Sequence, residues 1–132
     1  SFGFSLVLCG EIEHAIADRQ YASLGEICSA SLPAVDRYIV IATQGKGDVA
    51  ALQAALKMAA SYTAFVGSRR KFASYEDKLT AAGVSVAQIA TVRSPAGVHI
   101  NAVTPDEIAL SIMAEIIQTR RTARQQHAAD DA

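Results

Sequence analysis

Short apolar runs alternate with amphipathic stretches along this chain, and the alternation predicts strands and helices in turn. Unbroken apolar runs are typical of strands that are covered on both faces, as in parallel sheets. Such runs predict strands at 4–9, 25–30, 36–43 and 61–67, with a further strand or its approach at 84–92. Helical spacing of apolar residues predicts helices over 13–23, 48–60 and 70–83, the last ending at Gly83. Elements in this order predict an α/β fold with a mainly parallel sheet.

The clearest helix signal follows a loop at 93–103 that contains proline and glycine. Thr104 suits the N-cap, Pro105 the first helical position, and Glu107 the capping-box position three residues after the cap. The apolar face of this helix is formed by Ile108, Ile112, Met113, Ile116 and Ile117. The polar, alanine-rich end predicts a frayed or disordered tail at 123–132, so one domain is expected over residues 1–122.

Composition and charge narrow the classes of function. The chain has 132 residues, of which 51% are hydrophobic, and this fits a folded domain with a real core. The formal net charge of −1 argues against nucleic acid or a membrane surface as a partner, so any attraction for anions must be local. No spanning apolar stretch or signal peptide is recognisable, and a cytoplasmic protein is expected. Cys9 and Cys28 are expected to be buried free thiols, with sulfur transfer as the alternative.

Three loops should meet where ligands bind in parallel α/β sheets, at the carboxyl ends of the strands. One of them reads "FVGSRRK" and places Arg69, Arg70 and Lys71 directly after Gly67 and Ser68. Ser68 suits an N-cap, and the amides that follow it lack helical partners, which favours an anion. Arginine also grips phosphate with a planar fork, so this turn predicts a phosphate site. The alternative is a solvated basic turn paired with Glu76 or Asp77.

The other two loops carry weaker signals. "TQGKGD" contains Thr43, Gln44 and Gly45, and it fits a binding loop or a plain flexible turn equally well. The loop at 93–103 contains Pro95 and Gly97, together with His99 as a loop histidine, a general base or a metal ligand. Glu115 is either a buried, hydrogen-bonded carboxylate or part of the outer helix face. No metal-ligand cluster and no set of nucleophile and base is recognisable, so binding is expected rather than turnover.

Three segments carry a resemblance to a known family, namely "YIVIATQGKGDVAALQAAL", "YTAFVGSRRK" and "SPAGVHINAVTPDEIALSIMAEII". Together they resemble the Rossmann domain of the xanthine dehydrogenase accessory factor family, XdhC/CoxI. The resemblance covers roughly residues 1 to 121. The resemblance implies a Rossmann-like three-layer fold and a cytoplasmic maturation factor for molybdenum hydroxylases. It also implies binding of the molybdenum cofactor (molybdopterin), a phosphate-bearing pterin, for delivery to the apo-enzyme.

The resemblance assigns the phosphate-side turn to Gly67, Ser68, Arg69, Arg70 and Lys71, and the ring walls to the other two loops. This chain departs from the family at Gln44 and Gly45, where Thr-His-Asp is usual after the strand. The family's first strand and its glycine-rich turn have no counterpart, which leaves open an absent beginning, a partner strand or a rearranged sheet. The alternatives are an NAD(P)-binding oxidoreductase-like domain and a non-catalytic oligomerisation module. Homodimerisation is left open.

Overall fold

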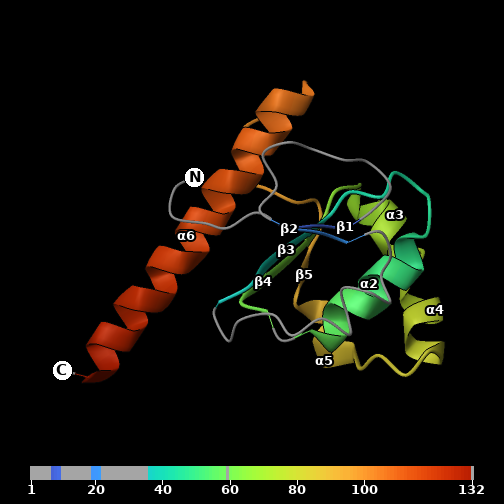
Figure 1. The fold of residues 1–132 in the computed structure, drawn as a ribbon, viewed down its shortest axis with the longest axis horizontal. Helices are drawn as coiled ribbons and strands as arrows, with labels where there is room; N and C mark the ends of the chain where they lie inside the picture. Colours follow the sequence, from blue (N-terminus) through green and yellow to red (C-terminus); the bar gives the residue numbers. More distant parts are fainter. Residues whose placement is uncertain (1–6, 10–18, 22–35, 59, 132) are drawn as a thin grey trace. The chain divides into compact units, whose positions relative to one another are not determined.

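The computed structural model describes two compact units of the chain, residues 1–35 and residues 36–132 (Figure 1). Within them, the described residues are 7–9, 19–21, 36–58 and 60–131. No helix in this part combines the length and the apolar character needed to cross a bilayer. The expected domain boundary at residue 122 stays a prediction.

The described residues of the first unit form a pair of parallel strands. β1 (Val7–Cys9) pairs with β2 (Arg19–Tyr21), and Val7 lies opposite Arg19 in the register. β1 agrees with the strand predicted at 4–9. The helix predicted over 13–23 is wrong at 19–21, because strand pairing there outweighs a weak helical pattern. The rest of that segment, the strand predicted at 25–30 and Cys28 lie outside the described residues.

The second unit is built on three parallel strands. β3 (Tyr38–Ile41), β4 (Tyr62–Phe65) and β5 (Val92–Arg93) lie in the order β3-β4-β5. All four residues of β4 are buried, as an apolar central strand requires. The strands predicted at 36–43 and 61–67 are therefore confirmed.

The helices of this unit follow the strands, with three differences from the prediction. Their bounds are α2 (Asp48–Lys57), α3 (Arg69–Ala73), α4 (Glu76–Ala81), α5 (Val86–Ala90) and α6 (Pro105–Asp131). The single helix predicted over 70–83 is broken at Ser74 and Tyr75 into α3 and α4. Most of 84–92 is α5, started by a capping box of Ser85 and Gln88. Helix α6 continues through the segment predicted to be a frayed tail.

The sheet of the second unit is covered on both faces. Phe65 of β4 packs with Phe72 of α3 and Tyr75, in a core that also includes the fully buried Leu52 and Leu79. Tyr62 points to the opposite face of β4, because residues three apart on a strand alternate sides, and it contacts α6. Figure 1 shows α6 on one side of β3, β4 and β5 and the helices α2 to α5 on the other. The three-layer α/β arrangement is confirmed.

Candidate functional site

The three loops predicted to form a site meet at one edge of the β3-β4-β5 sheet. Each follows the carboxyl end of a parallel strand, so topology alone places them side by side. The Ser94 hydroxyl lies 3.4 Å from the carbonyl oxygen of Gly67 and 3.5 Å from that of Ser68. On the other side, the Lys71 ammonium lies 3.7 Å from the Asp48 carboxylate. The turn after β4 therefore links the other two loops.

The turn after β4 packs closely on the ring of Phe65 from the strand that precedes it. A Cβ at Gly67 would lie 2.5 Å from the buried Phe65 ring, so glycine is the residue that fits. Ser68 is the N-cap of α3 and accepts a hydrogen bond of 3.0 Å from the Lys71 amide, as expected. The first bond of helical type runs from the Phe72 amide to the Ser68 carbonyl. The amides of Arg69 and Arg70 precede that bond and have no place in the helical ladder.

Arg69 and Arg70 are exposed at the start of α3. The ion pairs within the second unit join Lys71 to Asp48 and Arg93 to Glu115, and among its described residues neither Arg69 nor Arg70 pairs with Glu76 or Asp77. The alternative of a self-paired basic turn therefore finds no support in the geometry. Arg69 and Arg70 thus lie at the N-terminus of a helix, where each positive charge lowers helix stability by about 0.3–1 kcal/mol.

The loop after β3 is a hydrogen-bonded turn organised by Asp48. The Asp48 carboxylate, which is 3% exposed, accepts hydrogen bonds from the Thr43 hydroxyl, the Gly45 amide (3.0 Å) and the Tyr75 hydroxyl (2.6 Å). Burial raises the pKa of Asp48, but these hydrogen bonds and the Lys71 charge outweigh it and hold that pKa below its ordinary value. The group is an anion at neutral pH.

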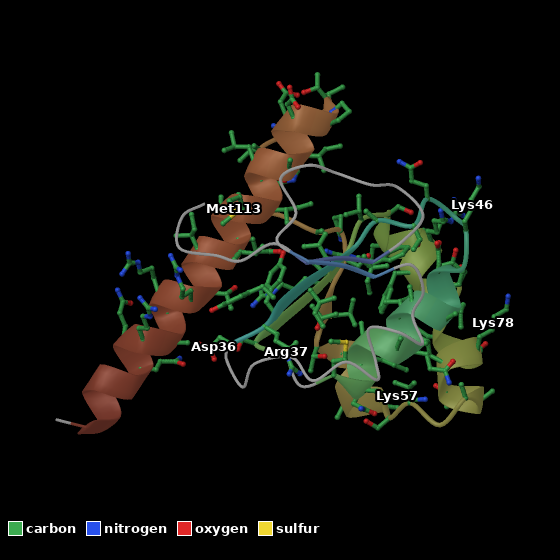
Figure 2. All side chains as sticks on the ribbon, viewed as in Figure 1. Asp36, Arg37, Lys46, Lys57, Lys78 and Met113 are labelled. Atoms are coloured by element: carbon green, nitrogen blue, oxygen red, sulfur yellow. The ribbon has the colours of Figure 1, made fainter. Side chains whose placement is uncertain are left out.

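The backbone of this turn explains its glycines. Gln44, Gly45 and Gly47 all have positive φ angles, and glycine takes such angles without a steric cost. Lys46 lies at the tip of the turn and points away from the sheet, whereas Lys57 lies at the opposite end of α2 (Figure 2). Thr43, Gln44 and Gly45 therefore determine the shape of the turn after β3. Lys71 is joined to this turn through its ion pair with Asp48.

The loop after β5 is held against α6 by Glu115. One oxygen of this mostly buried carboxylate accepts hydrogen bonds from the Tyr62 hydroxyl (2.6 Å) and the Gly97 amide (3.0 Å). The other oxygen lies 3.9 Å from Nη1 of Arg93, whose guanidinium also lies over the Tyr62 ring. Burial, and then the hydrogen bond and charge of Glu115, raise the pKa of Tyr62 despite Arg93. The sequence left Glu115 undecided, and it is a buried, hydrogen-bonded carboxylate.

Gly97 has a φ of +98° and lies directly against α6. A Cβ at this position would lie 2.2 Å from Oγ of Ser111, and the Val98 amide donates to the Ser111 carbonyl. Ser111 is buried and its hydroxyl donates to the Ile108 carbonyl. The loop can lie this close to the helix only because residue 97 has no side chain.

A pocket of about 410 Å³ lies between the turn after β4, the loop after β5 and the start of α6. Four predicted site residues line it, namely Gly67, Ser68, Pro95 and Gly97. Its other walls are largely apolar and include Val66, Ile100 and Ile108, with His99 and Asn101 among the polar members. The other six predicted residues, Thr43, Gln44, Gly45, Arg69, Arg70 and Lys71, lie outside the lining. Within the described part of the chain, no three His, Cys, Asp or Glu residues gather as metal ligands do.

The sequence interpretation missed the residues that hold the loops in place. Asp48, Tyr62 and Tyr75 form anchoring contacts and do not line the pocket. For Asp48 a signal existed, because an acidic residue directly after a glycine turn begins a helix whose first position favours a negative charge. For Tyr62 and Tyr75, nothing in the neighbouring sequence indicates that their hydrogen-bond partners are Glu115 and Asp48.

Comparisons with known proteins agree with this architecture. The family model described as the XdhC Rossmann domain matches residues 1–116. Over 88 residues, the chain is 35% identical to the uncharacterized protein YqeB of Escherichia coli (strain K12), covering 67% of this chain and 16% of YqeB. A crystal structure described as a xanthine dehydrogenase from Bacillus halodurans superposes with a TM-score of 0.69 at 23% identity, covering 92% of this chain and 37% of that one. The latter likeness establishes a Rossmann-like fold, and the chain spans about one sixth of the length of YqeB.

Proposed function

Because this chain belongs to the XdhC Rossmann-domain family, we propose that it serves in an accessory factor for molybdenum hydroxylases and binds the phosphate-bearing pterin molybdopterin. The observation that carries the proposal is that Arg69 and Arg70 stand at the Ser68-capped start of α3 beside a pocket, with no ion-pair partner among the described residues. The family resemblance supplies the class of client enzyme and the identity of the cofactor. The geometry supports the proposal with a cavity and with two cations beside it.

The cavity and the turn suit a small molecule with one phosphate. A volume of about 410 Å³ falls within the range of about 300–1,000 Å³ that is common for small-molecule sites. The apolar wall residues Val66, Ile100 and Ile108 suit a flat ring system. Ser68 and the amides of Arg69 and Arg70 would hold the phosphate, with the two guanidinium groups at the rim. No nucleophile with a base beside it stands among the lining residues, so the proposed role is binding and delivery.

The test is a calorimetric titration of the protein with molybdopterin under anaerobic conditions, with NADPH as the competing probe. We expect the double variant Arg69→Gln with Arg70→Gln to bind molybdopterin at least about 10-fold more weakly, since hydrogen bonds to charged groups contribute about 1.5–3 kcal/mol each. The control is Lys57→Gln with Lys78→Gln, which removes the same charge. Neither lysine lines the pocket, because Lys57 is the last residue of α2 and Lys78 lies on α4 (Figure 2). The control should bind like the wild type.

Three results would contradict the proposal in different ways. Equal losses in the two double variants would show a general charge effect and remove the role of Arg69 and Arg70. Tighter binding of NADPH than of molybdopterin would favour the oxidoreductase-like alternative. Failure of the wild type to bind either probe would favour an oligomerisation module, which analytical ultracentrifugation would then test.

A further inference from the structure

Asp48 connects two parts of the proposed anion site without lining the pocket. Its carboxylate takes hydrogen bonds from Thr43 and Gly45 in the turn after β3. The same carboxylate takes a hydrogen bond from Tyr75, which directly precedes α4, and lies 3.7 Å from Lys71 on α3. One buried anion therefore ties the turn to the short helix that carries Arg69 and Arg70.

The short helix is oriented by Phe72 in the core and by the contacts of Asp48. α3 contains five residues, and Phe72 is its buried member. The Tyr75 ring packs edge-on against Phe65, with centroids 6.0 Å apart, and its hydroxyl ends on Asp48. A helix of this length is not stable by itself, so tertiary contacts of its residues and of the residues that follow it set its orientation. Asp48 makes two of those contacts.

We infer that Asp48 is a positioning residue for anion binding, which orients α3 so that Ser68, Arg69 and Arg70 face a common ligand. This inference rests on the proposed function. Asp48 is not among the residues that line the pocket, so its effect on a ligand would pass through Lys71 on α3 and Tyr75 just after it. Three neutral donors also satisfy the carboxylate without Lys71, so the anchor persists when a bound anion draws Lys71 toward itself.

A double-mutant cycle separates positioning from a general loss of stability. Molybdopterin affinity is measured by calorimetry for the wild type, Asp48→Asn, the double variant Arg69→Gln with Arg70→Gln, and the combination of all three substitutions. We expect Asp48→Asn to weaken binding about 10-fold in the wild-type background and less than about 2-fold where both arginines are absent. A purely structural role would weaken binding by the same factor in both backgrounds.

Two further variants keep the test decisive if Asp48→Asn folds poorly. Tyr75→Phe removes one hydroxyl and keeps the ring against Phe65, and we expect it to weaken binding about 3-fold with the same dependence on the arginines. Ser85→Ala removes the cap of α5, the helix that leads into the amino end of β5, whereas the proposed site lies at the carboxyl ends of the strands. It should lower the melting temperature while leaving affinity unchanged.

The outcomes distinguish this inference from the proposed function. If the wild type binds molybdopterin and both Asp48→Asn and Tyr75→Phe bind it equally well, the positioning role is overturned and the proposed function stands. Equal losses with and without the arginines also overturn it. If the wild type binds no molybdopterin, the proposed function fails, and the positioning role fails with it.

Discussion

The contact between Gly97 and α6 makes a sharp prediction about stability. In Gly97→Ala, the new Cβ would lie 2.2 Å from Oγ and 3.0 Å from the carbonyl carbon of Ser111, and a backbone atom cannot swing aside as a side chain can. The φ of +98° adds backbone strain of about 1–2 kcal/mol for a residue with a side chain. Overpacking adds about 1–3 kcal/mol. The free energy of unfolding should fall by about 2–5 kcal/mol.

Gly83 provides a matched control, because it has a φ of +95° and no atom within 4 Å of the Cβ position. Gly83→Ala should therefore show the backbone strain alone, about 1–2 kcal/mol. The assay is urea denaturation followed by circular dichroism, in which the midpoint falls by the free-energy change divided by a slope of about 1–3 kcal/mol/M. If Gly97→Ala and Gly83→Ala lose the same stability, the loop does not press on Ser111, and the account of the pocket wall is refuted.

Three other predictions concern the frame of the site. Leu79→Ala should cost about 2–5 kcal/mol in urea denaturation because Leu79 is fully buried, and Leu110→Ala, at an exposed position, should cost less than about 0.5 kcal/mol. Thr104→Ala should cost about 1 kcal/mol, since Thr104 accepts from the Glu107 amide in a capping box. The raised pKa of Tyr62 means that the folded state holds the phenolic proton more tightly than the unfolded state. The stability that Tyr62 contributes to the folded state is therefore full below about pH 10 and is lost as the pH rises above that value. Tyr62→Phe should lack this alkaline loss when urea midpoints are compared from about pH 8 to about pH 11.

The positions of the three loops could be predicted from the sequence because topology fixes them. Parallel strands present their carboxyl ends at one edge, so recognising β3 and β4 was enough to place the turns that follow them. Caps of single residues are equally local: Ser68 and Thr104 are followed by amides that must find acceptors, and both do accept them. These features depend on short-range rules that one sequence contains.

Short elements were harder to predict for a physical reason. The apolar residues in "VSVAQIATV" fit a strand as well as a helix, and they do not show that Val86 is exposed while Val84 and Ile89 are buried. The capping box of Ser85 and Gln88 was the deciding signal, and it lies inside a segment dominated by apolar residues. At the break between α3 and α4, the Tyr75 hydroxyl donates to Asp48 across 27 positions, a contact that no local pattern reveals.

The two carboxylates that anchor the loops, Asp48 and Glu115, lie on helices on opposite faces of the sheet. Asp48 begins α2 on one face of the sheet and holds the turn after β3 together with α3, whereas Glu115 lies on α6 on the other face and holds the loop after β5 (Figure 1). A displacement of α6 would therefore reach the Gly97 wall of the pocket directly through Glu115, and would reach the turn after β4 only through Ser94 of the same loop. The turn after β4 and the loop after β5 therefore have different carboxylate anchors, and the Ser94 hydroxyl is the contact that joins them.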